Sequence, residues 1–399
     1  MLRTAIITSD RELATELNCA LQSCREVGQI RALDYDSEDR QMTARIRTIA
    51  PRLVFLGIES PEKTIALASH LHAQFPGVAI LAFGRQGRYD RIGEVMEAGI
   101  EQYLAQPFEP SCVRACVDSC LDNLEPRTEH VYAFLPSKAG VGASTLAVNV
   151  AVAMAAQCGP ALLADLDLNC GMTRFLLNLN NPNSVVDAVG HALQMDDSRW
   201  RQMVTPRGKL DIIHAGPLDP DTRPGTGELQ ILLDYVRRKY QSVCVDLSSS
   251  LERVSLDVMG ESKRVFLVCT PESSSLHLAK EKLLYLKRVG LGEKVQILLN
   301  RYSQNASMTP EDVEELVGAA VAGTFSSDYP RISQAMNGGV PMSPATETGR
   351  QCFALAQSLL AGGKPAPKTL KGSSCDSSAA ERLEWDRLQF APRQMSFSS

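Results

Sequence analysis

The sequence lacks several features that would place it at once in a familiar class. Only 6% of its 399 residues are aromatic, and two are Trp. No apolar run approaches the roughly 18 residues that predict a membrane-spanning helix, so we expect none. Acidic residues outnumber basic ones, 46 to 41, and the net charge of −5 argues against a general nucleic-acid binder. With 44% hydrophobic residues, however, the chain is apolar enough to fold.

The chain has 11 cysteines, but their spacing is not typical of a metal site or of a disulfide framework. No CxxC pair occurs, and no His partner completes a zinc set. Cys112, Cys116 and Cys120 recur every four residues, which predicts one buried face of a helix. The N-terminus, MLRTAIITSDREL, places charge within and after a short apolar run, so it predicts a strand rather than a signal peptide. We therefore expect free thiols in a reducing cytoplasm.

Short apolar runs alternate with helical patterns along residues 1–123, which predicts parallel βα units and an α/β fold. This part carries 13 basic and 17 acidic residues, a net charge of −4. The expected strands are Ala5–Thr8, Gln29–Leu33, Leu53–Gly57, Val78–Phe83 and Ile100–Leu104, and the expected helices are Arg11–Cys24, Ser37–Thr48, Pro61–Phe75, Tyr89–Ala98 and Pro110–Leu124.

A polar linker over residues 124–130 precedes a second βα series, which we place at residues 131–362. Residues 363–399 are rich in Lys, Pro, Ser and Gly and are expected to be mostly disordered, with a short amphipathic helix possible at Arg382–Phe390. The expected strands of the second series are Val131–Leu135, Ala161–Ala164, Leu210–His214, Ser242–Val245, Val265–Cys269, Val295–Leu299 and Val321–Thr324.

The first series resembles the receiver domain of two-component response regulators. The resemblance rests on its size, on Pro51–Pro61 (PRLVFLGIESP) as the central strand, and on Ala98–Pro110 (AGIEQYLAQPFEP) as the last strand and turn. It implies a flavodoxin-like, three-layer α/β/α fold. An unrelated domain of the same fold is the alternative.

The residues needed for receiver phosphorylation are absent. By the resemblance, the nucleophilic carboxylate position falls on Gly57, and the lysine position before Pro107 falls on Gln106. The acidic pair after the first strand becomes Ser9-Asp10, and the hydroxyl position falls at Phe83 or Gly84. Without a carboxylate at Gly57 no aspartyl-phosphate can form. We therefore expect an atypical receiver that serves in docking or dimerisation.

The strongest signal of the second series is Phe134–Ala155, FLPSKAGVGASTLAVNVAVAMA, in which a strand enters a Gly-containing loop and then an apolar helix. This context predicts a phosphate loop whose backbone N–H groups bind phosphate oxygens. Gly140 and Gly142 allow close approach of the backbone, and Ser144 can offer a hydroxyl to Mg²⁺. The loop residues expected to contact nucleotide are Ala139, Gly140, Val141, Gly142, Ala143, Ser144 and Thr145.

KAGVGAST resembles the deviant P-loop of the MinD/ParA ATPases, KGGxGK[ST]. It keeps the first, signature lysine as Lys138 but has Ala143 where the second lysine belongs. In that family the signature lysine reaches the partner's nucleotide across an ATP-sandwich dimer, and the resemblance implies this role for Lys138. A purely structural Gly-rich turn is the alternative, which further matches in the family's order make less attractive.

Those further matches extend the resemblance to about residue 361. They imply catalytic carboxylates at Asp165 and Asp167 near Mg²⁺ and the attacking water, and a Walker B strand whose Asp246 is a Mg²⁺ partner with Ser144. Asn300 and Arg301 would read the adenine edge, and the segment 328–341 would close over the base. We assign no chemistry to the serine runs 248–250 and 273–275, which suggest exposed loops or helix caps.

The missing lysine predicts that nucleotide binding and hydrolysis are affected differently. Loss of a charge-assisted contact costs about 1.5–3 kcal/mol in binding, and loss of transition-state stabilisation often costs about 10²–10³ in rate. Lys138 and the backbone of the loop remain. We expect that ATP or ADP still binds with Mg²⁺ and that hydrolysis is very slow or absent.

Together, an atypical receiver followed by a MinD/ParA-like ATPase resembles the CpaE/TadZ family, which assists assembly of Flp/Tad-type pili. The resemblance implies a homodimer at the cytoplasmic face of the membrane, often at a cell pole, with secretion-apparatus partners including a secretion ATPase. Peripheral membrane association is possible, and no nucleic acid is expected. Two alternatives stay open: an active MinD/ParA-type ATPase that positions another cargo, and a signalling protein driven by phosphorylation.

Overall fold

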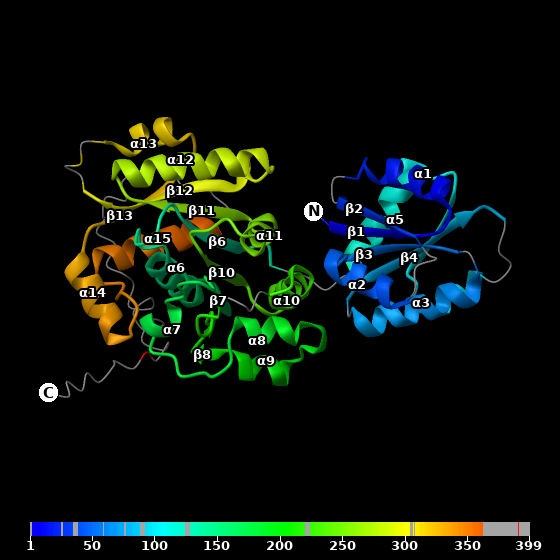
Figure 1. The fold of residues 1–399 in the computed structure, drawn as a ribbon, viewed down its shortest axis with the longest axis horizontal. Coiled ribbons are helices and arrows are strands. Elements are labelled where there is room, and N and C mark those ends of the chain that lie inside the picture. The colour runs from blue at the N-terminus through cyan, green and yellow to red at the C-terminus, as the bar shows by residue number, and fades with distance from the viewer. Residues whose placement is uncertain are drawn as a thin grey trace. The chain divides into compact units, whose positions relative to one another are not determined.

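The computed structural model describes residues 2–24, 27–34, 39–58, 60–75, 77–87, 92–123, 128–219, 224–303, 306, 308–361 and 390. They form two compact α/β units, the first comprising Met1–Pro126 with Gly225–Ile231, the second Arg127–Pro224 with Leu232–Ser399. The elements of both are labelled in Figure 1. Most of the linker at residues 124–130 and nearly all of the expected tail, including the helix expected near its end, lie outside the described residues.

The first unit contains a five-stranded parallel sheet with the order β2-β1-β3-β4-β5. This is the flavodoxin-like order, in which helices cover both faces and the strands' carboxyl ends meet at one edge. Its elements are β1 (Leu2–Ile7), α1 (Arg11–Leu21), β2 (Val27–Leu33), α2 (Asp39–Ile49), β3 (Leu53–Gly57), α3 (Pro61–Gln74), β4 (Ala79–Arg85), α4 (Ile92–Glu97), β5 (Gln102–Gln106) and α5 (Pro110–Asn123).

The three cysteines of α5 depart from the expected buried face. Cys120 is buried, Cys116 is half-buried and Cys112 is exposed. A spacing of four residues exceeds the 3.6 residues of a helical turn, so the line of side chains drifts around the helix by about 40° at each step. The helix therefore turns its first cysteine out to water while the last stays in the core.

The second unit contains an eight-stranded sheet with the order β13-β12-β11-β6-β10-β7-β9-β8. All its pairs are parallel except that of β8 with β9. The strands are β6 (Val131–Pro136), β7 (Ala161–Leu166), β8 (Thr205–Arg207), β9 (Leu210–Ile213), β10 (Ser242–Leu247), β11 (Arg264–Cys269), β12 (Val295–Tyr302) and β13 (Val321–Ser326). The sequence prediction missed β8, an edge strand of three residues that contains Pro206.

The helices that connect these strands complete the second unit, except that residues 226–231 of α10 belong to the first unit. They are α6 (Ala143–Cys158), α7 (Thr173–Leu176), α8 (Val185–Gly190), α9 (Asp197–Met203), α10 (Thr226–Lys239), α11 (Arg253–Glu261), α12 (Ser273–Arg288), α13 (Pro310–Val317), α14 (Tyr329–Gly338) and α15 (Glu347–Leu360), with short 3₁₀ turns at Ala192–Gln194 and Gly292–Lys294. None of the helices in the described part of the chain is long and apolar enough to cross a bilayer.

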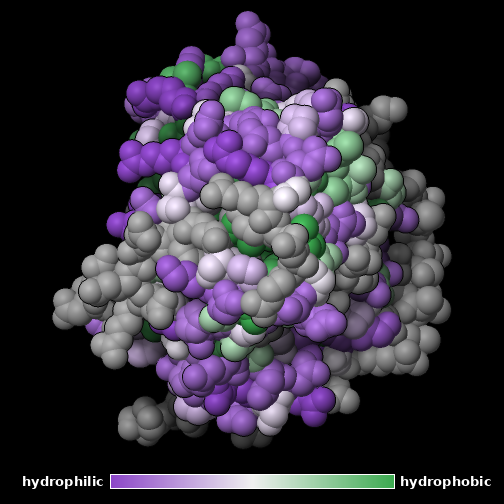
Figure 2. All heavy atoms as spheres, turned by 90° about the vertical axis from the view of Figure 1, so that its right-hand side faces the viewer, coloured by the Kyte–Doolittle hydropathy of each residue, from purple (hydrophilic) through white to green (hydrophobic). Residues whose placement is uncertain are grey.

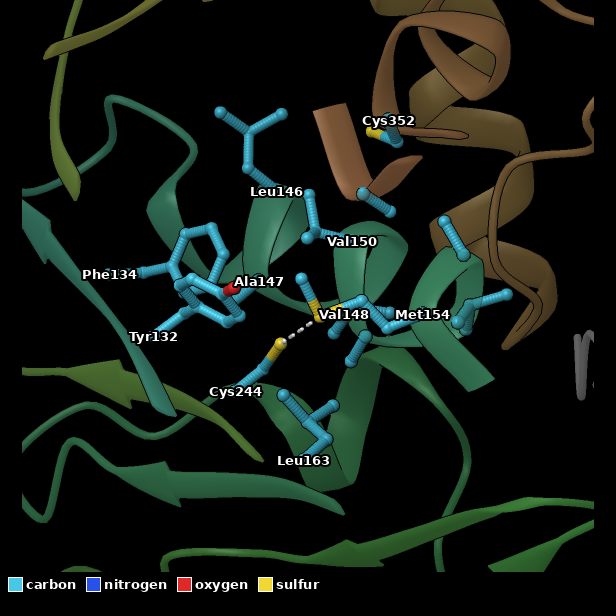
Figure 3. Close-up of a cluster of buried hydrophobic side chains, with 14 of the residues drawn as sticks. Tyr132, Phe134, Leu146, Ala147, Val148, Val150, Met154, Leu163, Cys244 and Cys352 are labelled. Atoms are coloured by element: carbon cyan, nitrogen blue, oxygen red, sulfur yellow. Dashed lines mark hydrogen bonds between the residues drawn. The ribbon is translucent and has the colours of Figure 1, made fainter. Parts of the chain in front are cut away.

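Helix α6 lies at the centre of the second unit's core. An unbroken run from Leu146 to Ala155 is buried, because the helix packs against the sheet as well as against α15. Figure 3 shows Leu146, Val150 and Met154 among aromatic side chains of β6, with the Cys244 thiol of β10 3.8 Å from the Met154 sulfur. A helix that is apolar all round must be buried, so the loop before it is held on a rigid base.

Water-facing surfaces of the described residues are mostly polar. In the face that Figure 2 shows, hydrophilic residues predominate and apolar ones form scattered patches. Exposed large apolar side chains of the second unit include Met172, Leu218, Leu278, Leu284 and Tyr329. Single exposed apolar residues are ordinary on protein surfaces.

Candidate nucleotide-binding site

The predicted phosphate loop joins the end of β6 to the start of α6, at the carboxyl edge of the second sheet. Gly140 and Gly142 have φ of +82° and +91°, a left-handed backbone that glycine adopts without strain. A Cβ at Gly142 would also lie 2.4 Å from the Asn300 amide nitrogen. The loop therefore needs glycine at position 142. It also leaves the N-terminus of α6, a helix of 16 residues, open to bind an anion.

Ala143 is the first residue of α6, and its side chain is 5% exposed. No cation can be supplied from this position. The other lysine of the motif, Lys138, donates from Nζ to Glu272 Oε2 at 2.7 Å and to Ser274 Oγ at 3.1 Å. This contact holds the pKa of Glu272 below its usual value. The signature lysine is thus paired within its own chain, and its role across a dimer stays a prediction.

Asp165 and Asp246 lie opposite each other on the neighbouring parallel strands β7 and β10. Both side chains are buried. Asp165 accepts hydrogen bonds at 3.0 Å from the backbone N–H groups of Asp167 and Thr173. Burial nevertheless raises the pKa of Asp165 to about 6. The two predicted carboxylates are therefore brought together in a site that opposes their charge.

Asp246 is the less satisfied of the two. Burial and, after it, the Asp165 carboxylate raise the pKa of Asp246 well above its usual value, and only the Ser144 hydroxyl opposes this rise. Neither carboxylate oxygen of Asp246 has a hydrogen-bond partner among the described residues, although the Ser144 hydroxyl lies close enough to affect the pKa. Two buried carboxylate oxygens without a partner, beside a hydroxyl, fit the binding of a cation.

Mg²⁺ suits this arrangement because it usually binds one or two carboxylates together with phosphate oxygens and water. Ser144 and Asp246 are the residues predicted to hold it, and that role stays a prediction. No group of three or more His, Cys, Asp or Glu side chains able to hold a metal occurs among the residues that the structure describes. The phosphates of a nucleotide would therefore have to supply further ligands, and the ion would in turn neutralise their charge.

Asp167 occupies the turn that follows β7. Its Oδ1 accepts from the backbone N–H of Asn169 at 3.2 Å and of Cys170 at 3.0 Å, and its charge contributes to raising the pKa values of Asp165 and Asp246. It is therefore near both buried carboxylates, although part of it faces solvent. Its contact with an attacking water remains a prediction.

Asn300 and Arg301, at the end of β12, contact the loop itself. The Asn300 amide donates to the carbonyl of Val141 at 2.8 Å, and the Arg301 guanidinium donates to the carbonyl of Gly140 at 2.8 Å. Arg301 has a φ of +54°. These contacts brace the loop from outside, so the structure brings both residues to the site. Their reading of a base is not tested.

The segment expected to close over the base is tied to α6. The buried Asn149 side chain of α6 donates to the carbonyl of Thr145 at 2.7 Å and accepts from the Met342 N–H at 2.6 Å. Met342 follows the predicted segment 328–341 directly. The Asn149 side chain thus connects α6, which begins at the phosphate loop, to the segment that is expected to close over the base.

Several residues of the site escaped the sequence analysis. The run 273–275 was expected to be an exposed loop or a helix cap; it begins α12, and Ser275 is buried there, with its hydroxyl 2.8 Å from that of Ser137 and accepting from the Thr270 N–H at 2.9 Å. Glu272, which binds Lys138, and Lys282, which binds the carbonyl of Pro136 at 2.7 Å, were also missed. The spacing of these side chains along the sequence gives no sign of such long-range contacts.

In the first unit, the edge that would hold a phosphorylation site is filled. A Cβ at Gly57 would lie 2.5 Å from the Thr8 hydroxyl. The Asp10 carboxylate binds the Arg85 guanidinium at 3.0 Å, and Arg85 also binds Glu12 at 3.2 Å. The pKa of Asp10 is lowered: burial opposes the shift, but a backbone N–H and Arg85 outweigh it. An arginine thus neutralises the acidic residue that remains.

The strand order, phosphate loop and paired carboxylates define the second unit as a P-loop fold of the MinD/ParA type. Among solved structures, a ParA family ATPase from Chlorobium tepidum matches with a TM-score of 0.54 and 21% identity, covering 58% of this chain and 99% of that one. The Pyrococcus furiosus cell division ATPase MinD matches with a TM-score of 0.51 and 19% identity, covering 59% and 100%. At this identity the likeness shows the fold.

Sequence relatives agree with this class. A putative septum site-determining protein MinD of Oltmannsiellopsis viridis is 22% identical over 254 residues, which are 59% of this chain and 78% of that protein. MinD of Thermotoga maritima is 20% identical over 214 residues, 52% and 78% respectively. A solved MinD of Pyrococcus horikoshii, with a TM-score of 0.50, 21% identity and coverage of 58% and 97%, is complexed with Mg-ADP. No family model matches the chain.

The filled edge of the first unit predicts that restoring one carboxylate does not restore phosphorylation. In Gly57→Asp the new side chain would collide with Thr8, and Arg85 would still neutralise Asp10. We expect no aspartyl-phosphate after incubation with acetyl phosphate and Mg²⁺, measured by intact-protein mass spectrometry, in wild type or variant. An active receiver serves as the positive control. A gain of one phosphate by folded Gly57→Asp would contradict this account.

The orphaned carboxylate predicts that Asp246→Asn stabilises the protein without ligand. A carboxyl group whose pKa is raised on folding binds more protons in the native state than in the unfolded state. Its ionisation therefore lowers stability as pH rises above its unfolded value near 3.8. Chemical denaturation at pH 5 and pH 8 should show a larger gain for Asp246→Asn at pH 8, of about 1–3 kcal/mol.

The same substitution should abolish the stabilisation that Mg·ADP gives to the wild type. Asp187→Asn, at the first turn of α8, provides a control carboxylate in the same unit but outside the site. A variant that is less stable than wild type at pH 8 and keeps the full response to Mg·ADP would show that Asp246 is an ordinary structural carboxylate.

Proposed function

We propose that this protein is a nucleotide-binding localisation and assembly factor for a Flp/Tad-type pilus, which acts as an ATP-sandwich dimer with weak or no hydrolysis. The observation that carries the proposal is the composition of the phosphate loop. The site keeps Gly140 and Gly142 and its predicted Mg²⁺ residues, Ser144 and Asp246, whereas Ala143 removes one of the family's two lysines. Binding is thereby favoured over turnover.

In this proposal each part of the site has a separate role. The N–H groups of the loop bind phosphate oxygens, and Ser144 and Asp246 hold Mg²⁺. Asp165 and Asp167 orient the attacking water. Hydrolysis is nevertheless very slow or absent, because no lysine at position 143 stabilises the transition state. Lys138 leaves Glu272 and contacts the nucleotide of a second copy, so that nucleotide state controls assembly.

The first unit supplies a second binding surface in this proposal. Gly57, Gln106 and the Arg85–Asp10 pair leave the unit without phosphorylation chemistry, which supports an atypical receiver used for docking. Partners would be pilus and secretion-apparatus proteins, including a secretion ATPase, at the inner face of the membrane near a cell pole. The order of the two units supports this family assignment over a single-domain MinD or ParA.

An active MinD/ParA-type ATPase that positions another cargo is the second candidate. The buried pair Asp165 and Asp246 favours it, because both carboxylates expected near Mg²⁺ and water are retained. A steady-state ATPase rate comparable with that of ordinary members, together with binding to DNA or a division protein, would support this function instead. The net charge of −5 does not favour DNA.

Lys138→Ala tests the proposed dimer. In size-exclusion chromatography with light scattering, we expect wild type to shift from monomer to dimer with Mg·ATP and Lys138→Ala to remain monomeric. Lys280→Ala, an exposed lysine of α12, is the control and should behave as wild type. A wild type that stays monomeric while it binds Mg·ATP would reject the sandwich dimer but leave nucleotide binding intact.

A further inference from the structure

Lys282 of α12 makes an unusual use of its ammonium group. Its Nζ donates to the carbonyl of Pro136 at 2.7 Å and to the carbonyl of Ser249. Pro136 ends β6 and stands directly before the phosphate loop, while Ser249 follows β10, three residues after Asp246. Strands β6 and β10 are neighbours in the sheet. One charged group therefore links the segment that leads into the phosphate loop to the segment that follows Asp246.

A surface role would leave this ammonium in water, since lysine normally extends its charged end beyond the apolar part of its side chain. Lys282 is instead half-buried, and burial lowers its pKa to about 8. No nearby charge contributes to that shift among the described residues. The two backbone carbonyls thus hold the ammonium group, and their hydrogen bonds compensate for the partial desolvation of its charge beside the phosphate loop.

We propose that Lys282 is a positioning residue of the nucleotide site, which holds the phosphate loop and Asp246 in register for a nucleoside di- or triphosphate. The proposal rests on the proposed nucleotide binding. The first residue of the loop has other, uncharged anchors: the Ser137 N–H donates to the carbonyl of Val268 at 2.8 Å, and its hydroxyl contacts Ser275. Lys282 adds the contact that links this anchor to β10.

The charge of Lys282 has a second consequence. Ala143 supplies no cation to the loop, and the Lys138 ammonium is bound to Glu272. A partly buried ammonium is screened less than an exposed one. Lys282 therefore adds positive potential behind the loop, where phosphate groups would bind, without touching them. It acts through the backbone and its field, and it is not a catalytic residue.

The test compares Lys282→Met, Lys282→Arg and Lys287→Met. Lys287 lies on the same helix and also donates to a backbone carbonyl, that of Gly318 at 3.1 Å, so it is a matched control away from the site. Calorimetric titration with Mg·ADP at pH 7, below all unfolding temperatures, should show affinity lowered about tenfold or more in Lys282→Met. Lys282→Arg should recover part of it, and Lys287→Met should match wild type.

Thermal denaturation of the same variants separates positioning from general stability. A merely structural lysine would lower the unfolding temperature in Lys282→Met and leave the affinity of the folded protein unchanged, and this result would overturn the proposal. A well-folded Lys282→Arg that binds as weakly as Lys282→Met would overturn it too, because the charged donor would then not account for the effect.

Failure of the proposed function can be recognised independently. If wild type does not bind Mg·ADP or Mg·ATP, hydrogen exchange of the ligand-free protein still tests the positioning. We expect faster exchange in Lys282→Met over residues 137–144 and 247–250, with no change in Lys287→Met. Unaltered protection of both segments would reject Lys282 as the group that holds them.

Discussion

The second unit depends on one electrostatic constraint: two carboxylates, Asp165 and Asp246, are buried opposite each other at the carboxyl edge of a parallel sheet. Parallel strands bring their carboxyl ends together, so strand register alone forces this proximity. Asp165 is partly compensated by backbone N–H groups, whereas both oxygens of Asp246 lack a partner among the described residues. The fold thus carries an electrostatic cost that the binding of a cation would relieve, and such binding would stabilise the native state.

The cations around the phosphate loop follow a consistent pattern. Lys138, Lys282 and Arg301 all surround it, but in this conformation each contacts a protein group: Glu272, the Pro136 carbonyl and the Gly140 carbonyl respectively. Position 143, from which the family's lysine would reach the phosphates, offers only a methyl group. Under the proposed function, such a site favours nucleotide binding over stabilisation of the transition state. In the first unit, Arg85 likewise neutralises Asp10, and Thr8 fills the space beside Gly57.

The parts of the fold and site that could be predicted are those marked by local sequence patterns. Strand ends, the Gly140–Gly142 turn and the carboxylates near the ends of β7 and β10 follow from short sequence patterns, and the α/β fold with its parallel sheets is confirmed. The edge strand β8 was missed because three residues containing a proline give no periodic signal. Contacts of Lys138 with Glu272 and of Lys282 with Pro136 join residues 134 and 146 positions apart. Only the folded chain brings such groups together, so no spacing rule could find them.

Nucleotide turnover in wild type and Ala143→Lys tests the central claim most directly, because it separates binding from catalysis at one position. Mg·ATP affinity and the single-turnover hydrolysis rate would be measured on the same samples. We expect wild type to bind Mg·ATP but hydrolyse it very slowly, and Ala143→Lys to hydrolyse it about 10²–10³ times faster. A wild type that hydrolyses ATP as fast as a folded, nucleotide-binding Ala143→Lys variant would contradict the claim that the missing lysine separates binding from turnover.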